Sequence, residues 1–214
     1  MFSLKKNKEK IFCIGLNKTG TTTIERVFSE FEYKLGDQNK GELLIHDWFN
    51  RKYKSIIDFS KSADAFQDIP FSLPTTFMFL EQYFKNAKFI LTIRDTEDQW
   101  YESITKFHSK LWSDGIRKPT LDDLKKAAYC YKGFAFDSNR YMFSTPENDP
   151  YNEAILKKYY SNHNYLVLEY FKSRPNKLIV INVTRDEDYL RLCKFLGKKP
   201  KSEKFPWENK TSTI

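Results

Sequence analysis

The stretch from Lys10 to Phe28 combines residue types and spacings that suit the binding of an anion. Ile11 to Leu16 is an apolar run of strand length, and Gly15 and Gly20 bracket a turn in which a ligand can approach the backbone. A helix with one apolar face is predicted to begin at Thr21 or the next residue. The first N–H groups of a helix lack partners and lie at the positive end of its dipole. These features predict a phosphate-binding loop between a strand and a helix.

The position of Lys18 distinguishes this loop from those that bind nucleoside triphosphates. The glycine spacing matches the pattern G-x-x-x-x-G-K-[ST], but Thr21 stands where that pattern requires a lysine. The order NKTGTT at residues 17–22 instead resembles the 5′-phosphosulfate loop of the sulfotransferases, in which proline usually stands in the place of Asn17. A strand, turn and helix in which the threonines only cap the helix is the alternative interpretation.

A second motif follows the strongest strand of the sequence, KFILTIR at residues 88–94. Its apolar run predicts a strand buried in a parallel sheet, with Arg94 at the carboxyl edge where open α/β sheets bind ligands. In the sulfotransferases, an arginine after a strand and a serine on the next helix hold the 3′-phosphate of the donor. Arg94 and Ser103 resemble this pair, although nine residues separate them instead of the usual eight. A guanidinium suits phosphate, but an arginine in this place can also be a salt-bridge partner only.

The C-terminal third extends the resemblance to small P-loop sulfotransferase-like proteins. The segments KLIVINV, LCKFLGKKP and KFPWENKT follow the order of a strand, a helix end and an F-P-x-x-N segment in that family. Residues 113–150 lie outside the resemblance. We therefore expect one sulfotransferase-like domain over residues 1–214, with a basic extension at 1–10 and a variable, acceptor-side insertion at 113–150.

The resemblance implies a three-layer α/β fold of the P-loop type, with a central parallel sheet flanked by helices. It also implies transfer of a sulfuryl group from 3′-phosphoadenosine 5′-phosphosulfate (PAPS) to a hydroxyl or amine of a small-molecule or carbohydrate acceptor. PAPS would be a co-substrate, the 3′,5′-bisphosphate (PAP) would be its product, and no metal would be required. Lys18 would stabilise the charge on the departing nucleotide. The loop residues implied to bind the nucleotide are Asn17, Lys18, Thr19, Gly20, Thr21, Thr22 and Thr23.

A general base is also required, and Asp68 is the candidate. Cytosolic members of the family place a histidine before the helix that precedes the arginine strand, and QDIP at residues 67–70 occupies that place. An ordinary carboxylate at a strand end is the alternative for Asp68. Weaker candidates for the base are Asp64, His46 and His108, and we expect His163 to be structural or to line the acceptor site.

Composition limits the other classes of function. The 214 residues, 17 % of them aromatic, predict one well-packed domain. The net charge of +8 fits a polyanionic ligand, although basic runs near both ends are typical of solvated surfaces, and no common nucleic-acid-binding motif is present. Three widely spaced cysteines and apolar runs no longer than a strand predict a reduced, cytoplasmic protein without a membrane span.

Two alternative functions stay open on the sequence. A P-loop nucleotide or small-molecule kinase would use the same loop, with Asp68 holding magnesium, although the usual lysine is missing. A nucleotide-binding protein without catalysis is the other. The helices expected from periodicity and capping signals cover residues 42–59, 75–84, 96–112, 120–134, 151–173 and 186–196, with irregular chain at 136–150.

Overall fold

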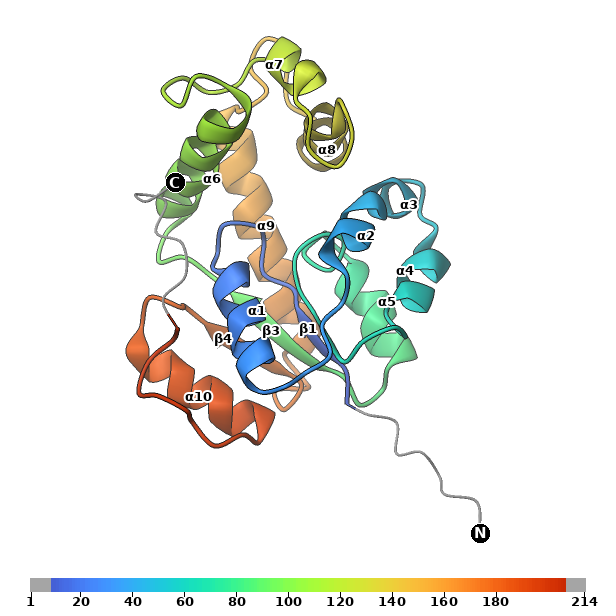
Figure 1. Ribbon diagram of the computed structural model, residues 1–214, viewed down its shortest axis with the longest axis vertical. Helices are drawn as coiled ribbons and strands as arrows, with labels where there is room; N and C mark the ends of the chain where they lie inside the picture. The colour runs from blue at the N-terminus through green and yellow to red at the C-terminus, as the bar shows by residue number, and fades with distance from the viewer. Residues whose placement is uncertain (1–8, 207–214) are drawn as a thin grey trace.

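A four-stranded sheet forms the centre of the protein. The computed structural model describes residues 9–206 (Figure 1). The strands lie in the order β2-β1-β3-β4, and every neighbouring pair is parallel. Their bounds are Ile11–Cys13 for β1, Ala65–Phe66 for β2, Lys88–Thr92 for β3 and Leu178–Ile181 for β4. The prediction of an α/β fold with a central parallel sheet is confirmed.

The central strands are buried on both faces because their side chains are almost all apolar. Phe12 of β1 lies opposite Phe66 of β2 and Phe89 of β3. The ring centroid of Phe12 is 5.5 Å from that of Phe66 and 5.6 Å from that of Phe89, so the three rings form one packed row. A strand covered on both faces reads as a continuous apolar run, which is why β1 and β3 are recognisable in the sequence.

Helices cover both faces of the sheet and complete three layers (Figure 1). One face packs against α1 (Thr21–Glu30) and α10 (Asp186–Leu196), and its core includes Ile24, Val27 and Leu192. The other face packs against α4 (Tyr53–Phe59), α5 (Thr76–Tyr83) and α9 (Glu153–Phe171), through Ile56, Phe77, Leu80 and Phe171. The bounds predicted for α5, α9 and α10 agree with these to within about two residues.

A group of helices extends beyond the carboxyl edge of the sheet. It contains α6 (Glu97–Trp112), α7 (Leu121–Lys126), α8 (Phe134–Phe143) and part of α9, and Figure 1 shows it above the strands. Its own core includes Trp100, Ile104, Leu124, Phe143 and Leu156. The short helices α2 (Gln38–Leu43) and α3 (Ile45–Phe49) lie between β1 and β2 in the chain. The expected helix over 42–59 is therefore divided into three short helices, α2 to α4.

The segment 120–150 differs from its prediction. A helix was expected to reach about Phe134, but α7 ends at Lys126 and α8 begins only at Phe134. Gly133, with φ of +93°, separates the two helices in a conformation that side chains disfavour. The chain expected to be irregular contains α8, whose Phe143 is buried in the helical core. The aromatic residues of this segment are thus shared between a turn and a second helix.

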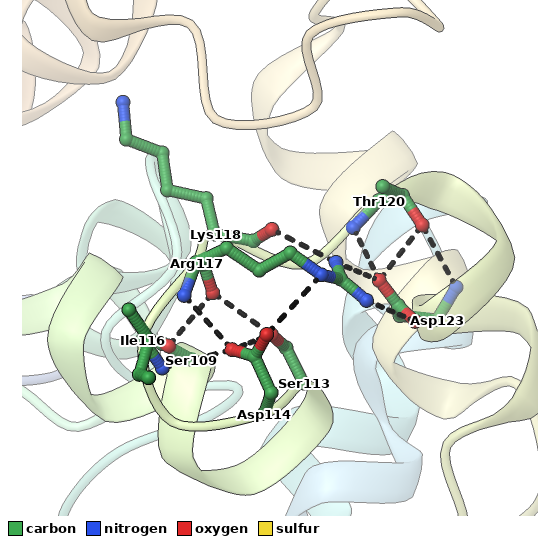
Figure 2. A network of polar contacts seen from close by, with 8 residues as sticks. All are labelled: Ser109, Ser113, Asp114, Ile116, Arg117, Lys118, Thr120 and Asp123. Atoms are coloured by element: carbon green, nitrogen blue, oxygen red, sulfur yellow. Dashed lines mark hydrogen bonds and ion pairs between the residues drawn. The ribbon is translucent and has the colours of Figure 1, made fainter.

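Polar contacts fix the connection between α6 and α7 (Figure 2). Asp114 Oδ1 accepts hydrogen bonds from the N–H groups of Ile116 and Arg117, both at 2.9 Å. The Arg117 guanidinium donates to Asp123 Oδ2 at 2.5 Å, close to the start of α7. Thr120 and Asp123 form the capping box that the sequence predicts. These contacts hold α7 against the end of α6, although all of them are close to solvent.

The three cysteines form no disulfide, and Cys13 and Cys193 are buried in the core. Across residues 9–206, no helix is both long and apolar enough to cross a membrane. Residues 1–8 of the expected basic extension lie outside the described residues. The FPWENKT segment lies outside them from residue 207 onward.

Candidate active site

The sheet brings three loops to one edge. The carboxyl ends of parallel strands meet at the same edge, so Lys18 follows β1, Asp68 follows β2 and Arg94 follows β3 in one place. After β1 the chain turns toward β2, whereas after β3 it turns toward β4. The crevice between β1 and β3 is therefore the topological switch point where open α/β sheets bind ligands. Lys18 lies there, with Asp68 and Arg94 on opposite sides of it.

A cavity of about 690 Å³ lies at this edge. Nearly all of the candidate residues line it: Asn17, Lys18, Gly20, Thr21, Thr22, Thr23, Asp68, Arg94 and Ser103. Thr19 is the exception, because this loop residue is fully buried. Its hydroxyl contacts the Leu16 carbonyl at 2.6 Å and the Thr92 hydroxyl at 2.5 Å. Thr19 therefore ties the loop to β3 and does not face the cavity.

Two glycines allow the loop to pass close to neighbouring strands. A Cβ on Gly15 would lie 2.0 Å from Thr92 Oγ1 and 2.5 Å from the Thr92 carbonyl oxygen. At Gly20, where φ is +105°, a Cβ would lie 2.3 Å from Val183 Cγ2. Only glycine fits either place without a shift of the surrounding backbone or side chain. The glycine spacing seen in the sequence is thus a packing requirement of this turn.

Side chains from distant elements fix the start of the loop. The Trp100 indole of α6 donates a hydrogen bond of 2.9 Å to the Asn17 carbonyl oxygen. The Ser72 hydroxyl donates to Asn17 Oδ1 at 3.2 Å. Asn17 therefore replaces the proline of the family pattern with a side chain whose conformation is fixed by a hydrogen bond. Trp100 is fully buried, so the bond also ties the loop to the helical core.

The N-terminus of α1 offers free donors to the cavity. Gly20 is the N-cap residue, and neither a side-chain cap nor an acidic residue is present in the first turn. The N–H groups of the first turn therefore have no acceptor within the helix. Thr21, Thr22 and Thr23 line the cavity, and their N–H groups lie at the positive end of the dipole. This arrangement fits a bound phosphate or sulfate.

Arg94 is positioned by two hydrogen bonds. Its Nε donates to the Lys18 carbonyl oxygen at 2.8 Å, and its backbone N–H donates to the Tyr160 hydroxyl at 2.9 Å. The Tyr160 ring stacks on Trp100, with centroids 5.0 Å apart. The hydrogen bond from Arg94 Nε joins the guanidinium directly to the loop. Ser103 of α6 lines the same cavity, so the spacing of nine residues still places it on the correct side of the helix.

Lys18 has an unusual backbone conformation and a perturbed charge. Its φ is +69°, a strained value that a structure retains where the surroundings enforce it. Its Nζ lies 3.5 Å from the centroid of the Phe107 ring. Burial, and then the nearby Arg94 guanidinium, lower the pKa of Lys18 to about 8, while Asp68 opposes the shift. Within residues 9–206, neither Lys18 nor Arg94 forms an ion pair, and an anionic ligand would offset both charges.

Asp68 is poised to accept a proton near neutral pH. Burial, and then the nearby Glu42 carboxylate, raise the pKa of Asp68 to about 7. A hydrogen bond of 2.9 Å from the Ile69 N–H to Asp68 Oδ1 and the charge of Lys18 act in the opposite direction. Like Lys18, Asp68 has a positive φ, of +64°. A pKa near the working pH suits a general base.

The weaker base candidates lie in other surroundings. His163 is buried beneath the loop, where its Nε2 lies 2.8 Å from the Ile14 carbonyl oxygen, so it is structural. His46 lies between the hydroxyls of Tyr131 and Tyr141 and does not line the cavity. His108 does line it, but burial and Lys18 lower its pKa to about 3. Asp64 accepts a weak hydrogen bond from a backbone N–H outside the cavity.

Sequence reasoning missed several residues of the cavity. Glu42 of α2 lines it with an exposed fraction of only 6 %. Ser138 of α8 and Tyr129, which precedes α8, line the same region. A buried glutamate has no sequence signature of its own, because an exposed helix contains the same residue type. Gly133 precedes α8 without a side-chain cap, and glycine is only modestly enriched at helix starts, so the start of α8 has no strong local signal.

A comparison with known protein families shows the family of the chain. A family model described as "Sulfotransferase domain" matches residues 10–214, nearly the whole chain. No curated protein matches the sequence. The matched range includes the loop at Lys18, the arginine after β3 and the C-terminal KFPWENKT segment. The chain therefore belongs to the sulfotransferase family.

Proposed function

We propose that the protein transfers a sulfuryl group from PAPS to a hydroxyl or amine of a small-molecule or carbohydrate acceptor. The observation that carries the proposal is the junction of Arg94 and Lys18 beside the free N-terminus of α1. Two cations without an ion-pair partner among residues 9–206 share one cavity with a carboxylate of raised pKa, Asp68. A donor with phosphate groups at the 5′ and 3′ positions of its ribose would match these charges.

The sheet order suggests how the donor lies. The 5′-phosphosulfate would contact the N–H groups at the start of α1 and Nζ of Lys18. The 3′-phosphate would accept hydrogen bonds from the Arg94 guanidinium and the Ser103 hydroxyl. Residues after β4, including Val183 and Thr184, line the cavity beside Arg94 and could enclose the nucleoside. The acceptor would then enter from the other side of Lys18, where Asp68 follows β2.

Transfer needs one bond to form and one to break. The acceptor oxygen attacks sulfur, the bond from sulfur to the bridging oxygen breaks, and its electron pair stays on that oxygen. Lys18 stabilises the charge that grows there, an interaction stronger in the transition state than before it. Asp68 receives the proton that the acceptor hydroxyl loses. The loop hydrogen bonds from Trp100 and Arg94 hold Lys18 in place for this step.

Residues 113–150 would supply part of the acceptor side. Seven of these residues line the cavity: Tyr129, Phe134, Ala135, Ser138, Asn139, Met142 and Phe143. These residues come from α8 and the turn before it, which pack against α3 through Phe134 and Ile45. We propose that this segment, which lies within the residues matched by the family model, selects the acceptor within a single domain.

Replacing Arg94 with alanine should weaken PAP binding by about 2 to 4 kcal/mol, the range for losing one partner of a desolvated charge pair. Ser103→Ala should weaken it less, because a hydroxyl contributes about 1 kcal/mol. Isothermal titration calorimetry with PAP measures both. Arg185→Ala is the matched control, since Arg185 pairs with Asp95 beside the site but does not line the cavity. Equal affinities for wild type and Arg94→Ala would show that another group holds the 3′-phosphate.

A further inference from the structure

Two carboxylates lie on the β2 side of the cavity. Asp68 follows β2 directly, and Glu42 comes from α2. The two are close enough for the charge of Glu42 to act on Asp68. The proposed mechanism uses Asp68 alone, so it leaves the buried Glu42 without a role. Glu42 therefore requires a separate explanation.

Glu42 is held as a hydrogen-bond acceptor by three neutral donors. Its Oε1 accepts from Gln38 Nε2 and from the Tyr129 hydroxyl, both at 3.1 Å. Its Oε2 accepts from the Cys130 thiol at 2.8 Å. An ionised carboxylate accepts at about four positions, so these contacts leave capacity for one more donor. Burial and the hydrogen bond to Glu42 raise the pKa of Cys130 to about 12, which keeps that thiol a donor.

The negative charge of this pair is not balanced by the protein. Within the described chain, neither Glu42 nor Asp68 forms an ion pair with a lysine or arginine. The charge of Lys18 acts on Asp68, but the proposed mechanism commits Lys18 to the donor. A buried charge is costly unless it is paired. The missing positive charge can come from a ligand.

Unpaired polar atoms of the same cavity point to a ligand independently. Gln67 and Ser138 line the cavity, are only 9 % and 8 % exposed, and each has a buried oxygen without a hydrogen bond. The Gln67 amide nitrogen donates to Gln38, whereas its oxygen, which as an amide oxygen can only accept, has no partner. A buried polar atom normally has a partner. The free oxygen of Gln67, which is linked to Glu42 through Gln38, therefore fits a ligand that donates hydrogen bonds.

Aromatic rings form another wall of the cavity. Trp112, Tyr129 and Phe134 all line it. The ring centroids of Trp112 and Tyr129 are 6.5 Å apart, and those of Tyr129 and Phe134 are 5.6 Å apart, so the rings are contiguous. The faces of aromatic rings attract cations. Rings and an unbalanced carboxylate together favour an ammonium group over a neutral hydroxyl.

We propose that the acceptor carries a protonated amine, which binds between Glu42 and the rings of Trp112, Tyr129 and Phe134, with its reacting hydroxyl at Asp68. This assignment rests on the proposed sulfotransferase function and specifies its acceptor as an amino alcohol, aminophenol or amino sugar. The ammonium keeps its proton, and the hydroxyl proton passes to Asp68. A neutral polyol would satisfy the free oxygens but would leave the charge of Glu42 unbalanced. No group of three metal-ligating side chains occurs within residues 9–206, so these carboxylates are not arranged as a metal site.

Matched probe pairs test the assignment in the full chain. Tyramine and 4-ethylphenol share a phenol hydroxyl but only tyramine carries an ammonium, and glucosamine and glucose form a second pair. Calorimetric titrations in EDTA, with and without saturating PAP, should show at least one aminated probe binding about tenfold or more tightly than its neutral partner. Equal binding within both pairs, or no binding by either aminated probe, would overturn the proposal. A further titration uses magnesium chloride in place of EDTA. Binding of magnesium in that titration would identify a metal as the occupant and would also overturn the proposal.

A variant pair locates the charge. Glu42→Gln keeps the shape of the side chain, and it should remove the preference for the aminated probe while the neutral partner binds as before. Glu102→Gln is the control, because Glu102 lines the same cavity from α6 but is exposed. A preference that survives Glu42→Gln would contradict the assignment, and the wild-type comparison decides even if that variant does not fold. PAP binding is measured separately, so its absence would refute the donor proposal while the titrations without PAP still test the amine site.

Discussion

Replacing Asp68 with asparagine should lower kcat by about 100- to 10,000-fold, the range that a positioned general base contributes. The amide keeps the size of the side chain but cannot take the proton from the acceptor. PAP affinity should stay close to that of wild type, because Asp68 lies on the opposite side of Lys18 from Arg94. Transfer of labelled sulfate from PAPS, followed at saturating acceptor, measures the effect. Asp64→Asn is the matched control, since Asp64 precedes β2 and lies outside the cavity.

The pH profile provides a second test of the same role. Asp68 must be deprotonated to act as a base, so kcat/KM should fall as the pH drops below about 7. Lys18 must be protonated to stabilise the leaving oxygen, so kcat/KM should also fall above about 8. The acidic limb should be missing from the residual activity of Asp68→Asn. Full activity in that variant, or an unchanged acidic limb, would exclude Asp68 as the base.

Replacing Lys18 with alanine should lower kcat by about 100- to 1,000-fold, as expected when a charge directed at a developing oxyanion is removed. Nucleotide affinity should fall less, because the N–H groups of α1 and the Arg94 guanidinium remain. Steady-state kinetics with PAPS, together with titration of PAP, separate the two effects.

Lys106→Ala is the control for Lys18→Ala. Lys106 also lines the cavity, but it is an exposed residue of α6. Its removal should leave kcat unchanged within about twofold, since exposed charges are well screened. Unchanged turnover in Lys18→Ala, or an equal loss in Lys106→Ala, would remove Lys18 from the mechanism.

The parts of the site that the sequence predicts are those that local chemistry encodes. The loop around Lys18 requires glycines where the backbone meets Thr92 and Val183, and β3 requires an apolar run that ends at Arg94. These requirements fall within short stretches, so their residue types and spacing are readable. Thr19 was predicted from the same pattern to bind the nucleotide, but its hydroxyl contacts the Thr92 hydroxyl and fixes the loop to β3.

The parts that were missed depend on contacts between distant segments. Glu42 is buried because Tyr129 and Cys130, more than 80 residues away, donate to it. No local pattern distinguishes such a glutamate from one on a solvated helix. The sequence predicts a helix to about Phe134 and irregular chain at 136–150, whereas α8 spans Phe134–Phe143, because the same aromatic residue types fill a core and line a cavity. Only the fold decides which of these roles each ring has.

The stability of the protein with different nucleotides tests the central claim most directly. A ligand that binds only the folded state adds about 2.7 kcal/mol at one hundred times its Kd, and it raises the Tm accordingly. If Lys18 and Arg94 bind two phosphate groups, PAP should raise the Tm strongly in EDTA, whereas ATP, which lacks a 3′-phosphate, should have little effect. A kinase should show the reverse and should require magnesium. Stabilisation by ATP with magnesium and none by PAP would contradict the assignment of PAPS as the donor.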